Sequence, residues 1–377
     1  MLAATEKLIR DSIHGVIEVS KGKRGLTLHR LPSKFAMYHD VDPLTQKVAD
    51  QASGARLAFV TSATQITVKY RATLDASEDG SFTSPPSSIT AVSSSVRQTI
   101  RHVNGDRRIW RGSEIAELQE GEDSIATFEF DSAHNRVVEL WLPHNCNIEL
   151  IDVSADAELS PAPQDNPRWV HYGSSISHSV EANEPTGVWP VVAAEIMGLN
   201  LYNLGLAGSA NIEQFAARTI AELPAELVTL KLGINPVNGR NMTLRTFVPA
   251  VHSFIDVIRD ANPAASIVVI SPIFCAAHEQ NPGPTSAGPD GKAIGAEHFE
   301  NDWVMDLTLE RIREALQEIV SRRGDSRLHY LNGLELFSGS DAHLMPDGLH
   351  PNAVGYRLIG ERFANILASY NPGELAV

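Results

Sequence analysis

The sequence predicts a parallel α/β domain preceded by an antiparallel β-sandwich. Two contrasting patterns lead to this prediction: apolar and polar residues alternate in the first 160 residues, whereas short apolar runs alternate with helical patterns after them. A stretch with three prolines and no periodicity, "DAELSPAPQDNPRW" (156–169), separates the two patterns. A chain of 377 residues is long enough for two domains. We therefore place a β-sandwich, of jelly-roll type, at 1–160 and an α/β domain at 161–377.

Period-two alternation is clearest in "RLAFVTSATQITVKYRATLD" (56–75), "SIATFEFD" (124–131) and "RVVELWLP" (136–143). Such runs, rich in β-branched and aromatic residues, are typical of half-buried strands. Clusters of Gly, Ser, Asp and Pro, such as residues 77–88, separate the runs. This part of the chain shows no amphipathic pattern longer than three helical turns, which favours a sandwich or jelly roll.

In the second part, apolar runs and helical patterns alternate. The predicted strands are 168–173, 199–205, 227–233, 266–273 and 327–333, and the predicted helices are 187–198, 212–222, 244–262, 303–323 and 352–369. Nearly continuous apolar strands, each followed by a helix, indicate a parallel sheet covered on both faces. Ligands of such sheets bind beyond the carboxyl ends of the strands. A long Gly/Pro loop at 281–295 could be a lid there or a simple insertion.

Composition excludes several classes of function. The formal net charge of −15 argues against a nucleic-acid surface and against binding to an anionic membrane. The two cysteines, Cys146 and Cys275, form no CxxC motif, so neither a disulfide framework nor a zinc cluster is expected. We find no secretory signal and no run long enough to span a bilayer, and we therefore expect a cytoplasmic protein.

The stretch "HYGSSISHS" (171–179) places Ser175 just after the first predicted strand of the sheet. A strand-to-helix turn exposes a nucleophile near free helix N–H groups, but a serine hydroxyl also needs a base. His350, in "PDGLHPN", is the candidate base, and Asp347 can hold one imidazole nitrogen. Alternatively, the stretch is a polar loop, Asp347 caps a helix and His350 is a surface residue.

Acyl transfer also needs hydrogen-bond donors for a developing oxyanion. The Ser175 N–H can supply one, and Gly208, after the second strand, lets the backbone approach a ligand. The side-chain amide of Asn235, after the third strand, can supply another. Alternatively, Gly208 is a turn glycine and Asn235 begins a turn, since Asn-Pro favours turns.

These four elements resemble the SGNH hydrolases, also called the GDSL family, whose blocks carry Ser, Gly, Asn and His in this order. The matching segments span roughly 168–370: "GSSIS" with Ser175, "LGLAGSAN" with Gly208, "LGINP" with Asn235 and "DGLHPN" with Asp347 and His350. Two positions depart from the family pattern: Ser174 and Pro236 stand where the family usually has Asp. The chain lacks G-x-S-x-G, which argues against the α/β-hydrolase alternative.

The resemblance implies a flavodoxin-like five-stranded sheet and an acyl-Ser175 intermediate. It also implies a catalytic triad of Ser175, Asp347 and His350 and an oxyanion hole of Ser175, Gly208 and Asn235. The two-domain layout resembles a bacterial branch of actinobacterial esterases and natural-product acyltransferases. We therefore predict an O-acyltransferase acting on a hydroxyl of a small molecule such as a polyketide-type natural product. A carbohydrate or small-molecule esterase is the alternative, and a non-catalytic carbohydrate-binding protein is the rival from another class.

Several other residues are candidates for substrate contact or for the core. His178, Cys275 and His278 follow predicted strands and could touch the substrate. His171 and Trp189 fit a packed core better. We expect no metal, because Cys275 and His278 form a lone C-x-x-H. We expect no cofactor either, although an acyl-CoA could serve as co-substrate. The expected partners are thus a small-molecule acyl donor and a hydroxyl acceptor; nothing in the sequence fixes the oligomeric state.

Overall fold

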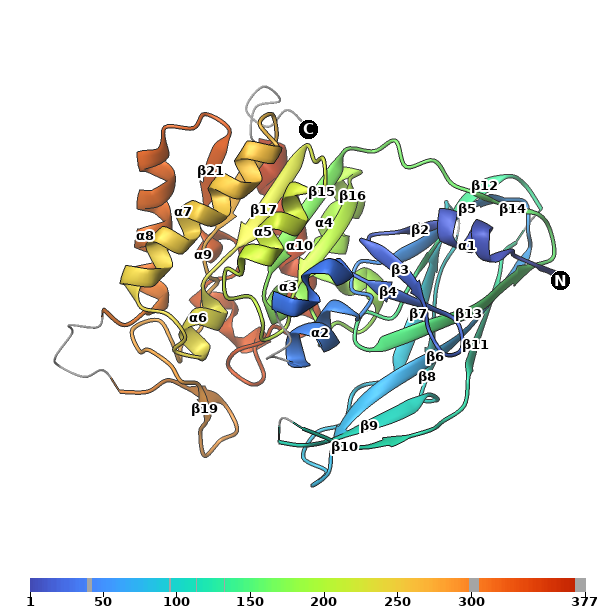
Figure 1. Cartoon of the computed structure of the whole chain (residues 1–377), viewed down its shortest axis with the longest axis horizontal. Coiled ribbons are helices and arrows are strands. Elements are labelled where there is room, and N and C mark those ends of the chain that lie inside the picture. The colour runs from blue at the N-terminus through green and yellow to red at the C-terminus, as the bar shows by residue number, and fades with distance from the viewer. Residues whose placement is uncertain (39–42, 95, 113, 132, 298–304, 370–377) are drawn as a thin grey trace. The chain divides into compact units, whose positions relative to one another are not determined.

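The computed structural model describes residues 1–38, 43–94, 96–112, 114–131, 133–297 and 305–369 (Figure 1). The chain divides into two compact units. The first consists of Met1–Asp165 with Asn183–Thr186, and the second of Asn166–Ala182 with Gly187–Val377. The sequence analysis placed its boundary slightly earlier, between residues 160 and 161.

The first unit contains two β-sheets. One has the order β10-β9-β6-β13-β4-β3, with β1 added on β13 and β11 on β6. Its strands are β1 (Leu2–Ala3), β3 (Glu18–Lys21), β4 (Leu26–His29), β6 (Gln65–Ser77), β9 (Asp106–Arg111), β10 (Glu114–Gln119), β11 (Ser124–Glu129) and β13 (Asn147–Ala155). The other has the order β14-β5-β12-β7-β8, with β2 added on β5. Its strands are β2 (Ile13–His14), β5 (Arg56–Thr61), β7 (Ser87–Val92), β8 (Arg97–His102), β12 (Arg136–Trp141) and β14 (Leu159–Pro161).

The two sheets bury their inner faces in one shared core. Alternate residues of β6, namely Ile66, Val68 and Tyr70, are fully buried, as period-two alternation predicts. Leu57, Phe59, Val138 and Leu140 of the other sheet join the same core. The predicted antiparallel β-sandwich is therefore confirmed, with one local departure, because β6 and β9 run parallel. The helices of this unit are short: α1 (Glu6–Asp11), η1 (Ser33–Tyr38) and α2 (Pro43–Ala49).

The second unit is built on a five-stranded parallel sheet of order β16-β15-β17-β18-β21. Its strands are β15 (Arg168–Gly173), β16 (Asn200–Gly205), β17 (Leu227–Lys231), β18 (Ser266–Ile270) and β21 (Leu328–Leu331). Every residue of β17 and β18 is buried, as expected for strands covered on both faces. In chain order this is a 2-1-3-4-5 sheet, so the predicted flavodoxin-like fold is confirmed.

All five predicted helices are present, with shifted ends. The helices are α3 (Ser175–His178), α4 (Trp189–Met197), α5 (Gln214–Ala221), α6 (Ile234–Asn238), α7 (Leu244–Ala261), α8 (Leu309–Arg323), α9 (Gly333–Leu336) and α10 (Ala353–Ser369), with the 3-10 helices η2 (Pro185–Gly187) and η3 (Gly339–Leu344). Helix α8 begins later than predicted, because the Thr308 side chain caps it by accepting the Arg311 N–H; residues 303–304 of that prediction lie outside the described residues. The sequence analysis missed α3, α6 and α9, since a single turn has no periodicity to detect. The loop 281–295 contains a small hairpin of β19 (Ser286–Ala287) and β20 (Ala293–Ile294).

Ring contacts show which helices cover which face of this sheet. Trp169 of β15 stacks on Phe363 of α10, with ring centroids 5.2 Å apart, and also contacts Trp189 of α4. Tyr172, three residues further along β15, contacts Phe254 of α7 on the opposite face. Helices α4 and α10 therefore cover one face and α7, with α5 beside it, covers the other (Figure 1). Trp189 is fully buried, which confirms it as a core residue.

A chain of buried hydrogen bonds joins the sheet to α3. The Trp169 indole N–H donates to Thr229 Oγ1 at 2.8 Å, and the same oxygen lies 2.6 Å from His171 Nδ1. Burial holds the pKa of His171 well below its ordinary value, so the imidazole is neutral. His171 Nε2 lies 2.7 Å from Ser177 Oγ. Since a neutral imidazole has one donor and one acceptor nitrogen, it bonds to both hydroxyls and joins Thr229 to Ser177.

We expect Thr229→Val to destabilise the protein, because it leaves the indole N–H and His171 Nδ1 buried without their partner. Each unpaired group costs about 1–3 kcal/mol, so the expected loss of unfolding free energy is about 2–6 kcal/mol, measured by denaturant unfolding. Thr229→Ser keeps the hydroxyl and is the matched control, with an expected loss of about 1 kcal/mol for one methyl group. Equal stability of the two variants would contradict the hydrogen-bond chain.

Candidate active site

The predicted catalytic residues gather where the strand order of the second unit reverses. Strand β15 lies between β16 and β17, so the strand that follows it in the chain is on one side and the later strands are on the other. Ser175 follows β15, Gly208 follows β16 and Asn235 follows β17. The carboxyl ends of adjacent parallel strands lie at one edge of a sheet, and the point of reversal is the usual place for a ligand in this fold.

Helix α3 presents Ser175 at its first residue. Ser174 is the N-cap, and its Oγ accepts the Ile176 N–H at 3.4 Å. Ser174 thereby acts as the capping residue at a position where the family usually has Asp. The N–H of the first helical residue has no partner within its own helix, so the Ser175 N–H is available to a ligand.

Two glycines allow α3 to lie directly on the sheet. A Cβ atom on Gly173 would lie 2.2 Å from Ser177 Oγ, and one on Gly205 would lie 2.4 Å from the His178 nitrogen. Asn203 supports the same contact, because its Nδ2 donates to the Ser177 carbonyl at 3.0 Å. The start of the helix is therefore held at a fixed height above the strand ends.

Ser175, His350 and Asp347 form one hydrogen-bonded chain. Ser175 Oγ lies 2.9 Å from His350 Nε2, and His350 Nδ1 lies 2.7 Å from Asp347 Oδ2. Asp347 Oδ1 accepts the backbone N–H groups of Leu349 at 2.9 Å and of His350 at 2.7 Å. A carboxylate can only accept, so the imidazole proton is on Nδ1 and the lone pair of Nε2 faces the serine hydroxyl.

The ionisation of Asp347 and His350 suits a general base at His350. Burial of Asp347 would raise its pKa, but hydrogen bonds from the His350 ring and from the two backbone N–H groups outweigh burial and lower the pKa to about 2. Asp347 is thus ionised at neutral pH. Burial of His350 would lower its pKa, but the hydrogen bond to Asp347 and the nearby carboxylates outweigh this effect, so the pKa of His350 lies above its ordinary value.

Asn235 is oriented by the loop that carries Gly208. Asn235 Oδ1 accepts the Ala210 N–H at 3.0 Å, which directs the Nδ2 end of the amide away from that bond. Gly208 has φ = +73°, a conformation that favours glycine. Pro236 lies in the first turn of α6, where a missing N–H costs little, so it does not disturb the Asn235 backbone.

The sequence analysis did not detect a buried pair that holds this loop. The Tyr172 hydroxyl donates to Glu213 Oε2 at 2.6 Å, and Glu213 Oε1 accepts the Asn211 N–H at 2.7 Å. Ile212, which lies between Asn211 and Glu213 in the sequence, has φ = +64°, a strained conformation for a β-branched residue. Its N–H donates to the Tyr172 hydroxyl at 3.1 Å. No local pattern marks this pair, because its members are distant in sequence.

The structure does not support substrate contact by the other three candidates. His178 is fully buried, on the inner side of α3. His278 is also fully buried, and its ring nitrogens lie 2.8 Å from Thr285 Oγ1 and 3.2 Å from the Asn281 carbonyl oxygen. Cys275 is 2% exposed, and its thiol donates to the Gly348 carbonyl at 3.3 Å. The segment after β18 buries both Cys275 and His278, and Cys275 supports the turn that carries His350. Substrate contact by the three residues stays a prediction.

The described parts of the chain hold no group of three or more His, Cys, Asp or Glu side chains arranged to bind a metal ion. Nor do they contain a helix with the length and apolar character needed to cross a membrane.

The first unit contains a second set of Ser, His and Asp side chains joined by hydrogen bonds. Ser20 Oγ lies 2.8 Å from His29 Nε2, and His29 Nδ1 lies 2.6 Å from Asp50 Oδ1. Ser20 lies inside strand β3, however, and not at the start of a helix. Triad distances alone therefore do not distinguish Ser175; its place at a helix start beside the loop of Asn235 does.

Comparison with known proteins assigns a family to this site. Residues 171–358 match the sequence model of the GDSL-like Lipase/Acylhydrolase family, and this range includes all the predicted catalytic residues. The second unit belongs to this family. The match confirms the predicted resemblance to the GDSL family, whose members are enzymes. A search of curated protein sequences gave no match.

Solved structures share the fold of the whole chain with this GDSL protein. A salicylyl-acyltransferase from a tetracycline biosynthetic pathway has a TM-score of 0.77 at 23% identity, covering 95% of this chain and 94% of that chain. A protein from Bacteroides ovatus described as a GDSL-like lipase has a TM-score of 0.66 at 16% identity, covering 97% of both chains. A family two carbohydrate esterase from Clostridium thermocellum has a TM-score of 0.56 at 12% identity, covering 84% of this chain and 92% of that chain.

We expect a fluorophosphonate probe to label Ser175 and to label Ser20 at least about 100-fold more slowly, since only Ser175 has oxyanion donors within reach. Mass spectrometry of the labelled peptides measures both rates. Ser175→Ala should abolish the fast labelling, and Ser20→Ala should leave it unchanged. Fast labelling of Ser20, Ser174 or Ser177 would show that the assignment is wrong.

We expect Asn235→Ala to lower kcat for an activated ester by about 10²–10³-fold with little change in KM, as for a lost oxyanion donor. Asn235→Asp keeps the acceptor for Ala210 but has no amide donor, so it should lose as much. Asn241→Ala removes a more exposed amide nearby and should leave kcat close to that of the wild type. A change in KM alone would instead make Asn235 a residue that only binds substrate.

Proposed function

We propose that this protein transfers an acyl group through Ser175 to a hydroxyl of a small molecule, such as a polyketide-type natural product. One observation carries the acyl-serine part of the proposal. Ser175 Oγ lies 2.9 Å from His350 Nε2, and the same imidazole lies 2.7 Å from Asp347. Ser175 is also the first residue of α3, where a free N–H is available for an oxyanion.

In the first half-reaction, Ser175 Oγ attacks the carbonyl carbon of an ester or thioester donor. His350 Nε2 takes the hydroxyl proton, and Asp347 stabilises the resulting imidazolium. The Ser175 N–H, the Gly208 N–H and the Asn235 amide hold the oxyanion. The tetrahedral species collapses when the bond to the leaving alcohol or thiol breaks, and His350 gives its proton to that group. The product is acyl-Ser175.

The second half-reaction repeats these steps with a new nucleophile. His350 removes the proton of an acceptor hydroxyl, the acceptor oxygen attacks the acyl-Ser175 carbonyl, and Ser175 Oγ leaves and recovers the proton. With water as the nucleophile the same steps give a free acid. Every proton transfer uses His350, so the scheme calls for no cofactor beyond the acyl donor, which could be an acyl-CoA.

One structural observation supports transfer over hydrolysis. The hairpin β19–β20 is attached to the catalytic turn, because the Ala293 N–H donates to the Asp347 carbonyl at 2.8 Å. A wall beside His350 can exclude water and help to place an acceptor. The shared fold with a salicylyl-acyltransferase agrees with this proposal. The carbohydrate esterases with the same fold support hydrolysis as the second candidate.

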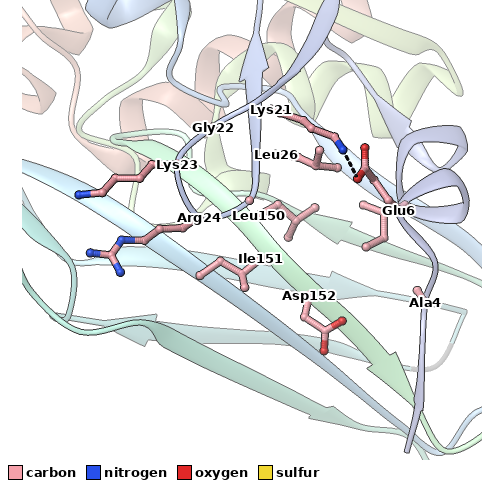
Figure 2. A pocket seen from close by; sticks show the side chains of 12 residues that line it. Ala4, Glu6, Lys21, Gly22, Lys23, Arg24, Leu26, Leu150, Ile151 and Asp152 are labelled. Atoms are coloured by element: carbon pink, nitrogen blue, oxygen red, sulfur yellow. Dashed lines mark ion pairs between the residues drawn. The ribbon is translucent and has the colours of Figure 1, made fainter.

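One cavity of the first unit gives little support to carbohydrate binding. This cavity of about 300 Å³ is lined by Lys21, Lys23 and Arg24, among other residues. Figure 2 shows these side chains. None of the described residues that line it is aromatic, so it offers no ring on which a sugar could stack. Its cations are also paired, since Lys21 lies 3.1 Å from Glu6 and Lys23 lies 3.2 Å from Glu120.

The two candidate reactions are separated by a competition between acceptor and water. We expect acyl thioester and acyl ester donors, offered with a panel of hydroxylated polyketides and sugars, to give product ester faster than free acid. Chromatography coupled to mass spectrometry measures both products, and Ser175→Ala is the control for uncatalysed transfer. Free acid alone, formed at a rate that no acceptor changes, would establish an esterase. Sugar binding by Ser175→Ala and the wild type with no turnover of any donor would favour the binding protein.

A further inference from the structure

A second carboxylate lies beside the catalytic imidazole. Glu181 Oε1 is 3.9 Å from His350 Nδ1, the same nitrogen that donates to Asp347 Oδ2 at 2.7 Å. Glu181 follows α3 in the chain, and Asp347 belongs to the turn before α10. Two acidic groups from different parts of the second unit therefore approach one ring nitrogen.

The Glu181 carboxylate is held by a buried partner. The Tyr356 hydroxyl donates to Glu181 Oε2 at 2.6 Å, and Tyr356 is fully buried in the first turns of α10. Burial and the negative charge of Glu181 hold the pKa of Tyr356 well above its ordinary value, so the phenol remains a donor. One carboxylate oxygen is thus fixed by Tyr356, while the other is the one that approaches His350.

The other groups around His350 do not cancel these two charges. Burial raises the pKa of the Cys275 thiol, which contacts the catalytic turn, to about 11, so it is neutral. Lys292 of the neighbouring hairpin presents its side-chain carbons to Gly348, and its Nζ lies 4.0 Å from Asp290. Ser175 on the Nε2 side is uncharged. Among the residues that the structure describes, the charges closest to the imidazole are therefore Asp347 and Glu181.

We propose that Glu181 is a positioning residue that acts through His350: it stabilises the imidazolium beside Asp347 and takes over part of the role of Asp347 when that carboxylate is removed. The inference rests on the proposed acyl-serine function, but it holds equally for transfer and for hydrolysis. In both half-reactions His350 becomes positively charged, and a second negative charge about 4 Å away favours that state.

The proposal predicts a shift in the titration of His350. Removing one negative charge disfavours the protonated ring, so Glu181→Gln should lower the pKa of His350 by about 0.5–1. Tyr356→Phe frees the carboxylate without removing its charge and should give a smaller shift. Glu361→Gln removes a charge from an exposed site on α10 and should leave the pKa of His350 unchanged.

NMR titration of histidine-labelled full-length protein measures this shift without requiring turnover. The His350→Asn variant identifies the His350 signal among the 14 histidines. Glu181→Gln keeps the shape of a partly exposed side chain, and Glu181→Asp tests for partial rescue. A shift in Glu181→Gln no larger than that in Glu361→Gln would overturn the proposal, whether or not the enzyme turns over the donors tested.

Kinetics supply the second readout. The base must be unprotonated, so activity falls as the pH drops through the pKa of His350. In Glu181→Gln this acid limb of kcat/KM should move to lower pH.

Loss of the triad carboxylate can cost about 10⁴ in kcat. With Glu181 in place, Asp347→Asn should lose only about 10–10²-fold. Adding Glu181→Gln should bring the loss to about 10⁴-fold. A full loss in Asp347→Asn, with no further effect of Glu181→Gln, would contradict the proposal, whereas an inactive wild type would count against the proposed function alone.

Discussion

The carboxylate of Asp347 is the constraint on which the site depends. One of its oxygens accepts the backbone N–H groups of Leu349 and His350 and so closes the turn, while the other accepts His350 Nδ1–H. The same group therefore shapes the loop, selects the tautomer and leaves Nε2 as the acceptor that faces Ser175. The neighbouring hairpin and the Cys275 thiol bond to carbonyls of this turn and hold it from outside.

Position at the end of the sheet, more than triad distance, makes Ser175 the candidate nucleophile. The chain Ser20-His29-Asp50 has similar hydrogen-bond lengths but lies on a strand, where no helix start supplies free N–H groups. At Ser175 the sheet, the glycines beneath α3 and the buried bonds from His171 to Ser177 together fix the start of the helix. Catalysis of acyl transfer requires oxyanion donors as well as a base, and this arrangement can supply both.

Long, strongly patterned features were predictable from the sequence, whereas local geometry was not. Largely apolar strands such as β17 identify the parallel sheet, and the convergence of strand ends then brings residues as distant as Ser175 and His350 together. Burial was harder to predict: His278 follows a strand, yet its segment folds inward and the ring is buried. Glu181 was missed because it lies in an aperiodic turn, and its partner Tyr356 looks like an ordinary helix residue until the fold brings the two together.

In the proposed mechanism a substrate acyl group passes through Ser175, and the decisive experiment is to trap that acyl-enzyme. Protein incubated with a panel of acyl thioesters and esters would be acid-quenched within the first turnover, weighed intact and then mapped as peptides. We expect a mass increase equal to the acyl group, located on Ser175, that disappears on addition of an acceptor and does not form in His350→Ala. Turnover with no adduct at any quench time, or an adduct on another residue, would contradict the mechanism.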